Sequence, residues 1–189
     1  SYVTEEEWEA ADMGQEENNA AVAAVMKKAA NKEDITIACI GGSITQGTIS
    51  NGTADKEVGF KKSYVELFSR WWTDTFPETG INVINAGIGA TDSYLGVHRV
   101  DEDVLSYTPD LVLVEFSVND AGSNRARINY DNLVRKILLA DNHPAVMLLF
   151  MGQTNGSNAQ TSHALVGFQY GLPMISYCNV IQKMMDDGQ

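Results

Sequence analysis

The sequence predicts an α/β fold in which helices cover both faces of a parallel sheet. Two observations predict it. Short apolar runs of strand length alternate five times with segments of helical periodicity, and this alternation is typical of a parallel sheet with connecting helices. Residues 35–40 and 111–116 are apolar almost throughout rather than at every second position, which indicates strands that are buried on both faces.

The composition sets the limits for function. A chain of 189 residues, of which 44% are hydrophobic, has the size and composition of a single globular domain. No apolar run approaches the roughly 20 residues of a membrane span. The formal charge is −12, from 25 acidic against 13 basic residues, which disfavours nucleic acid as a partner and is compatible with a neutral polysaccharide.

The chain begins with an acidic part and a helix. Residues 1–17 are expected to be a solvated segment, because they are polar and rich in glutamate. Residues 18–30 predict a helix with Lys27 and Lys28 near its carboxyl end, where the helix dipole favours positive charge. We therefore divide the chain into an N-terminal part, 1–34, and a main domain, 35–189. Because Ser1 is neither a Met nor part of a signal sequence, we expect a processed or cloned fragment.

The remaining elements follow from periodicity. The expected strands are 35–40, 81–86, 111–116, 145–151 and 171–176. The expected helices are 60–76, 93–104, 128–140, 158–170 and 177–185. In the helix 60–76, aromatic residues including Trp71 and Trp72 recur at helical spacing, and a core-facing stripe is favoured over a sugar-stacking surface. The long polar loop 48–59 and residues 153–155 are expected to line a substrate cleft.

Ser43 is the candidate nucleophile. It follows Gly41 and Gly42, which break the first apolar run, and ligands of open α/β sheets bind at the carboxyl ends of the strands. A phosphate loop is disfavoured because its lysine is absent, and a lipase-type nucleophile turn is disfavoured because Thr45 replaces its last glycine. A helix N-cap is the remaining alternative for Ser43.

Two further turns end strands that should lie beside the first. Gly87 and Gly89 match the first two glycines of the dinucleotide-binding pattern G-x-G-x-x-G, but Asp92 replaces the third. The alternative is that this turn directs a main-chain N–H donor at Ser43. Asn119 follows the third strand. Its side-chain amide is a second candidate donor, favoured over an Asx turn.

Three motifs together suggest a family. GGSIT at 41–45, NAGIGAT at 85–91 and VEFSVND at 114–120 occur in this order. They resemble the SGNH (GDSL-type) hydrolase family, most closely its bacterial carbohydrate (acetyl) esterases, over residues 18–189. The resemblance implies a flavodoxin-like, five-stranded, three-layer α/β/α sandwich and a secreted or extracellular serine esterase.

The resemblance also assigns roles to residues. Ser43 would attack the ester, and the N–H groups of Ser43 and Ala90, with Gly89 as the fallback, would form the oxyanion hole together with the Asn119 side chain. Asp120 would support the loop. Ala90 stands where the family has glycine, and Ser117 replaces the usual glycine of the third motif.

The general base is the unresolved part of the site. A serine nucleophile needs a base, nearly always histidine, and the family's D-x-x-H motif is missing between Ser176 and Gln189. The chain is therefore expected to be a fragment lacking its last ~20–30 residues. Alternatively, His163 substitutes, or the protein is a catalytically inactive carbohydrate-binding relative. His98 and His143 are expected to have no catalytic role.

The expected reaction is hydrolysis of acyl esters, acetyl esters above all, through an acyl-serine intermediate. The substrate would be a small-molecule or polysaccharide ester, with neither nucleic acid nor membrane as a partner. No cofactor is implied, and the three histidines show no metal-ligand spacing. Cys39 and Cys178 are interpreted as small hydrophobic residues rather than a bridge or a metal pair. A flavin or nucleotide binder is the weakest alternative.

Overall fold

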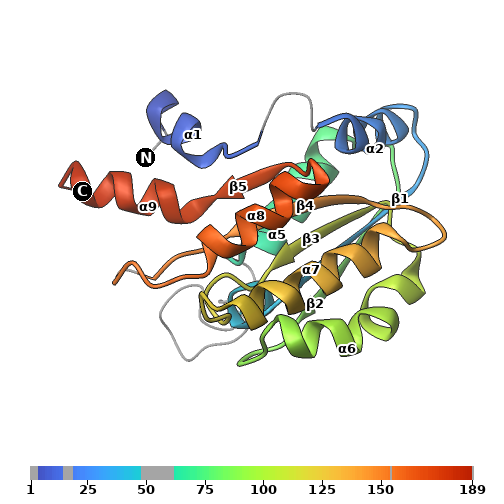
Figure 1. Cartoon of the computed structure of the whole chain (residues 1–189). Coiled ribbons are helices and arrows are strands. Elements are labelled where there is room, and N and C mark those ends of the chain that lie inside the picture. The colour runs from blue at the N-terminus through green and yellow to red at the C-terminus, as the bar shows by residue number, and fades with distance from the viewer. Residues whose placement is uncertain (1–3, 15–18, 48–61, 154, 189) are drawn as a thin grey trace.

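The computed structural model describes residues 4–14, 19–47, 62–153 and 155–188, and it shows helices on both faces of one sheet (Figure 1). The five parallel strands lie in the order β2-β1-β3-β4-β5. Their bounds are β1 Ile35–Gly41, β2 Ile81–Gly87, β3 Leu111–Glu115, β4 Ala145–Phe150 and β5 Met174–Ser176. This confirms the predicted α/β class and the flavodoxin-like sheet, whose strand order is 2-1-3-4-5.

The sheet brings three polar turns together at the carboxyl ends of its central strands. β1 pairs with β2 on one side and with β3 on the other, so that Gly41 lies between Gly87 and Glu115. The chain order reverses at β1, and sheets of this topology bind ligands beside such a reversal. The segments that follow Gly41, Gly87 and Glu115 therefore converge at one place.

One face of the sheet is covered by α6 (Ser93–Asp103), α7 (Asn124–Leu138) and α8 (Gln160–Tyr170). Helix α7 begins four residues before the predicted start, because the Ser123 hydroxyl accepts the N–H of Ala126 and caps an earlier turn. The inward residues of these helices and the sheet form the larger core. Its fully buried large side chains include Phe116, Tyr130, Leu133, Ile137, Leu148 and Phe150.

The opposite face carries α2 (Ala20–Ala30) and α5 (Tyr64–Thr75), which pack on β1 and β3. Trp72 is 1% exposed and contacts Phe68 and Phe76. The core-facing prediction is confirmed for Trp72. It is wrong for Trp71, which is 46% exposed, because adjacent residues of a helix point about 100° apart. The predicted start of this helix at Phe60 lies outside the described residues.

The expectation of a merely solvated N-terminal segment is wrong for residues 4–14, which contain a helix. Helix α1 (Glu5–Ala11) begins with a capping box, in which Thr4 and Glu7 bond to each other's main-chain N–H. It packs against α9 (Tyr177–Asp186). Asp12 then bridges to Ile175 of β5, and the Met13 N–H bonds to the Met174 carbonyl. The glutamates that suggested a solvated segment form the first turn, where the helix dipole favours negative charge.

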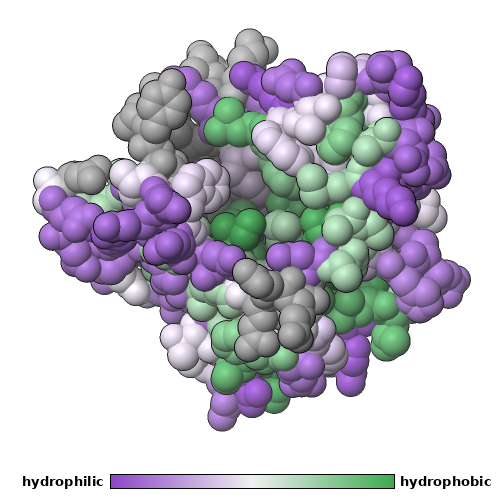
Figure 2. Space-filling view, turned by 90° about the horizontal axis from the view of Figure 1, so that it is seen from above, coloured by the Kyte–Doolittle hydropathy of each residue, from purple (hydrophilic) through white to green (hydrophobic). Residues whose placement is uncertain are grey.

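An apolar hollow of about 670 Å³ lies between α1, α5, α9 and the sheet. Its lining includes Leu113, Met147, Leu149 and Ile175 from the strands, and the space-filling view shows hydrophobic residues inside the depression (Figure 2).

None of the helices in the described ranges has the length and apolar character that a membrane span requires.

Candidate active site

Ser43 is the first residue of α3 (Ser43–Gln46), which follows β1 directly. The helix is a single turn, and it ends at Gly47, which has a left-handed conformation with φ 84°. Ser43 is half-buried. Its N–H lies in the first turn, where an α-helix provides no carbonyl partner. Both the hydroxyl and the N–H of Ser43 are thus presented at the carboxyl end of the sheet.

The turn that carries Ser43 is held against β2 and α5. The Asn85 side chain donates to the Thr45 carbonyl at 2.9 Å and accepts the Gly87 N–H at 2.9 Å. The Thr45 hydroxyl is 2.9 Å from the Tyr64 hydroxyl. A Cβ on Gly87 would overlap the main-chain nitrogen of Gln46, so a glycine is needed for this close approach.

Arg99 of α6 joins the ends of β1 and β2 below the serine turn. Its Nη1 donates to the Ala86 carbonyl at 2.7 Å and to Asp103 at 2.9 Å, and its Nη2 donates to the Gly41 carbonyl at 3.0 Å. No role for Arg99 follows from the sequence alone. The i,i+4 pair with Asp103 was visible in the sequence, but the two carbonyl acceptors depend on the fold.

Asn119 lies beside the serine turn. A Cβ built on Gly42 would be 2.7 Å from the Asn119 Oδ1 atom, so the amide is in contact with the residue that precedes Ser43. Within the described part of the chain, the Asn119 side chain makes no hydrogen bond, and it is half-buried. The amide is therefore available to a ligand next to Ser43, and its oxyanion role stays a prediction.

The two candidate donors of the second motif differ in the structure. A Cβ on Gly89 would be 3.8 Å from the Ser43 Cβ, but the Gly89 N–H donates to the Gln46 side chain at 3.0 Å. Gly89 is therefore not a free donor here, which argues against its fallback role. The Ala90 N–H has no hydrogen-bond partner among the residues that the structure describes. Ala90 has φ 60°, in the left-handed region that favours glycine.

Replacing Ala90 with glycine is expected to stabilise the protein by about 1 kcal/mol. The left-handed conformation costs a residue with a Cβ ~1–2 kcal/mol, and glycine removes this cost. The greater entropy of glycine in the unfolded chain offsets part of the stabilisation. Urea denaturation of Ala90→Gly measures the change. The matched control is Ala24→Gly, at an exposed position of helix α2, where glycine should cost about 0.5–1 kcal/mol. Equal destabilisation by both substitutions would contradict the prediction.

Glu115, the last residue of β3, is buried below this site. Its Oε1 atom accepts the main-chain N–H and the hydroxyl of Ser117, at 3.0 and 2.9 Å. The Oε2 atom has no partner among the described residues. Burial raises the pKa of Glu115 from 4.5 to about 7, and the hydrogen bonds from Ser117 act in the opposite direction.

This raised pKa predicts a loss of stability as the pH rises. The folded protein binds the Glu115 proton more tightly than the unfolded chain, so the stabilisation is complete below pH 4.5 and is lost as the pH rises through about 7. The free energy of unfolding should fall by on the order of 3 kcal/mol over this range from Glu115 alone. Glu115→Gln should remove this component of the pH dependence, whereas Glu33→Gln, at an exposed position, should leave it unchanged. Urea titrations at several pH values measure both.

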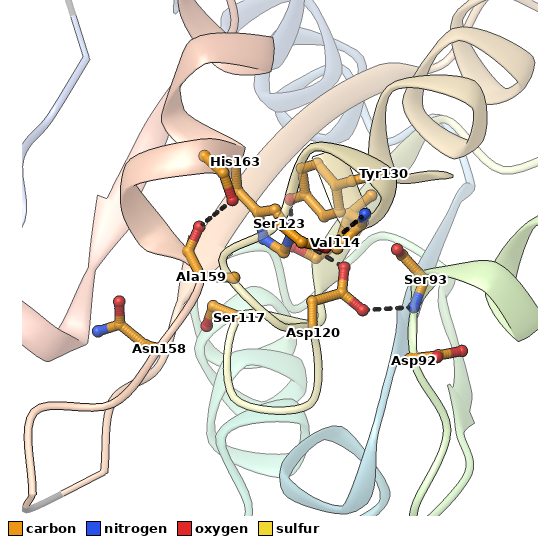
Figure 3. Close-up of polar contacts among 12 residues, drawn as sticks. Asp92, Ser93, Val114, Ser117, Asp120, Ser123, Tyr130, Asn158, Ala159 and His163 are labelled. Carbon is orange, nitrogen blue, oxygen red and sulfur yellow. Dashed lines mark hydrogen bonds and ion pairs between the residues drawn. The ribbon is translucent and has the colours of Figure 1, made fainter. Parts of the chain in front are cut away.

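The histidines do not supply a base for Ser43. His163 is fully buried, and its Nε2 atom is 2.9 Å from the Asp120 carboxylate (Figure 3). This contradicts the alternative in which His163 substitutes as the base. His98 is exposed and contacts Tyr94. His143 is also exposed and lies before β4, at the opposite end of the strands.

Asp120 links the third motif to the start of α6, two residues after the second motif. Its Oδ1 atom accepts the N–H of Ser93, the first residue of α6, at 2.9 Å, while its Oδ2 atom contacts His163 (Figure 3). This geometry fits the supporting role predicted for Asp120. Its partner His163 could not be predicted from local sequence, because the two residues are 43 positions apart. No group of three or more His, Cys, Asp or Glu side chains suited to a metal ion occurs in the described ranges.

Comparison with solved structures finds esterases of the same fold. A two-domain esterase (CEX) active on acetylated mannans is 34% identical, with a TM-score of 0.87 over 96% of this chain and 47% of that chain. The same esterase co-crystallised with mannopentaose matches with a TM-score of 0.86. An acetyl xylan esterase, AlAXEase, is 19% identical, with a TM-score of 0.63 over 82% of this chain and 83% of that chain, and this likeness concerns the fold alone.

The chain spans about half the length of the two-domain esterase that it matches. A comparison with curated proteins found no match. The family model described as GDSL-like lipase/acylhydrolase matches residues 39–169, which include Ser43, Ala90, Asn119 and Asp120. With this match, and with the serine, the glycine turn and the asparagine at the ends of β1, β2 and β3, the chain belongs to the GDSL-like lipase/acylhydrolase family.

Proposed function

We propose that the protein is a serine esterase that hydrolyses acyl esters, chiefly acetyl esters on a polysaccharide, through an acyl-serine intermediate. The observation that carries the proposal is the contact of the Asn119 amide with Gly42, the residue before Ser43, at the carboxyl ends of β1 and β3. This amide bonds to no other residue that the structure describes. A nucleophile and an oxyanion donor are the two groups that acyl transfer needs at one point.

In the proposed reaction the Ser43 hydroxyl attacks the ester carbonyl carbon. The negative charge that develops on the carbonyl oxygen is held by the N–H groups of Ser43 and Ala90 and by the Asn119 side chain. Collapse of this intermediate expels the sugar oxygen, which takes up the proton that left Ser43. Water then hydrolyses the acyl-serine. A histidine base must carry the proton, and we propose that it comes from sequence outside these 189 residues, because no histidine here bonds to Ser43.

The substrate class rests on similarity and charge. The mannan-active two-domain esterase matches 96% of this chain at 34% identity, and a net charge of −12 does not oppose a neutral polysaccharide. We therefore propose acetylated plant-type polysaccharides, mannans first, as substrates. An enzyme acting on such polymers would work outside the cell.

The test is acetate release from acetylated mannan and from a chromogenic acetyl ester, together with labelling by an alkyl phosphonate. When the sequence that supplies the base is present, we expect acetate release and a phosphonate adduct on the peptide that contains Ser43, located by mass spectrometry. An adduct without turnover would indicate a reactive serine with an incomplete proton relay. An adduct on another serine would overturn the assignment.

The second candidate function is carbohydrate binding without catalysis. The observation that favours it is that His98, His143 and His163 all lie in contacts away from Ser43. Calorimetric binding of mannooligosaccharides, with neither acetate release nor a phosphonate adduct, would support this function over the esterase.

Replacing Asn119 with alanine is expected to lower kcat for acetyl ester hydrolysis by roughly 10²- to 10³-fold, the usual effect of losing one oxyanion donor. The thermal midpoint should change little, because the side chain makes no hydrogen bond to another described residue. Initial rates and thermal melts measure the two effects. Asn124→Ala, at the exposed first residue of α7, is the control, and an equal loss of activity in both variants would contradict the role.

A further inference from the structure

The buried pair of Asp120 and His163 touches none of the reacting atoms, yet it connects both loops of the proposed oxyanion hole. Asp120 follows Asn119 in the chain, and its Oδ1 atom holds the N–H of Ser93, three residues after Ala90. We propose that His163 is a positioning residue, which fixes the loops carrying Ala90 and Asn119 relative to each other by holding the Asp120 carboxylate. The inference rests on the proposed esterase function.

The carboxylate of Asp120 has two specific partners, one for each oxygen. Oδ1 accepts the Ser93 N–H and Oδ2 contacts His163 Nε2, each at 2.9 Å (Figure 3). The side chains of Asp120 and His163 are 2% and 0% exposed, so water does not compete for these bonds. A directional bond in a dry site resists rotation more than a solvated one. Rotation of the carboxylate would move the start of α6 and, with it, the turn at Ala90.

His163 is itself held from two sides. Its ring lies flat on Tyr130 of α7, with the ring centroids 3.6 Å apart and an angle of 2° between the planes. Its main-chain N–H bonds to the Ala159 carbonyl, and the Ala159 N–H bonds to the Ser117 carbonyl at 2.7 Å. The first turn of α8 therefore contacts the loop 116–120 twice, through Ser117 and through Asp120. This arrangement braces the segment that ends in Asn119.

The hydrogen-bond pattern indicates how His163 acts. Its Nδ1 atom is buried and has no partner among the described residues. A hydrogen there would be an unpaired buried donor, which is unfavourable, so the hydrogen-bond pattern places the ring hydrogen on Nε2. His163 then donates one hydrogen bond to Asp120. A glutamine could replace this donor, because its terminal amide nitrogen reaches a similar position, whereas leucine could only fill the space.

The structural test compares His163→Leu with His163→Gln by NMR. In His163→Leu, we expect amide exchange at Ser93 to accelerate by about 10-fold or more, and the signals of the Ala90 N–H and the Asn119 side-chain amide to shift. His163→Gln should restore these signals toward those of the unchanged protein. His98→Leu, at an exposed histidine of α6, is the control and should alter none of them. A lower melting temperature of His163→Leu with all three signals unchanged would overturn the proposal in favour of packing alone.

A second variant covers failure to fold. If His163→Leu does not fold, Asp120→Asn, which keeps the shape of the side chain, provides the same NMR comparison. We expect the Ala90 and Asn119 signals to shift. If the asparagine oxygen keeps the bond from the Ser93 N–H, its NH₂ group faces the N–H donor of His163, unless the histidine hydrogen moves from Nε2 to Nδ1. Unchanged signals in this variant would overturn the proposal.

The kinetic test separates positioning from binding. For acetyl ester hydrolysis, His163→Leu should lower kcat by about 10- to 100-fold with KM changed by less than about 2-fold, because misplaced oxyanion donors act on the transition state. His163→Gln should regain most of the loss. An unchanged kcat in His163→Leu would overturn the proposal. If the unchanged protein hydrolyses no ester, the esterase proposal fails for this chain, while the NMR comparison still decides the role of His163.

Discussion

Replacing Ser43 with alanine is expected to abolish the hydrolysis of acetyl esters and leave the fold intact. The loss should be roughly 10⁴- to 10⁶-fold, because without the hydroxyl no acyl-serine can form and only the oxyanion donors remain. The structure gives little reason for instability, since the Ser43 hydroxyl is in no hydrogen bond with another described residue and a helix start tolerates alanine. Initial rates and thermal melts on the purified variant test both statements.

The matched control for Ser43→Ala is Ser106→Ala. Ser106 is exposed, and among the described residues its hydroxyl bonds only to the Glu102 carbonyl, so its loss should leave the rate unchanged. The phosphonate adduct on the Ser43 peptide should disappear in Ser43→Ala and persist in Ser106→Ala. If Ser43→Ala retained more than a tenth of the rate, Ser43 would not be the nucleophile, and the interpretation of the first motif would be wrong.

Replacing Trp72 with alanine is expected to lower the free energy of unfolding by about 3–5 kcal/mol, the range for a buried aromatic residue truncated to alanine. Trp72 is 1% exposed and contacts Phe68, Trp71 and Phe76 at ring-centroid distances of 6.1, 5.3 and 5.5 Å. The cavity left between α5 and β1 cannot collapse easily, because the sheet and α2 surround it.

The neighbouring tryptophan provides the control for Trp72→Ala. Trp71 belongs to the same helix but is 46% exposed, so Trp71→Ala should cost no more than about 1 kcal/mol. Urea denaturation of both variants measures the difference. Similar costs for the two substitutions would mean that the aromatic cluster, rather than the burial of Trp72, determines the stability of this face.

The fold could be predicted from the sequence because its signals are local. The apolar runs that form β1 and β3 and the helical spacing of α5 and α7 depend only on neighbouring residues. The positions of Ser43 and Asn119 at the carboxyl ends of strands follow from the same local pattern, once the sheet is taken as parallel.

The contacts that support the site could not be predicted in this way. Arg99 binds carbonyls of Gly41 and Ala86, which come together only in the folded sheet. His163 of α8 contacts Asp120 in the loop after β3, and nothing in its own helix distinguishes it from a packing residue. Helix α1 was missed because its glutamates suggested solvation, whereas the capping box and the contact with α9 decide its structure.

The pairing of Asp12 and Met13 with β5 has a consequence for behaviour in solution. β5 is the last strand of the sheet, and a terminal strand exposes N–H and carbonyl groups that can pair with a strand of another molecule. The bridge to Ile175 and the bond to the Met174 carbonyl occupy part of that margin. We therefore expect the acidic N-terminal segment to oppose edge-to-edge pairing of two molecules, because it covers part of this strand and carries negative charge.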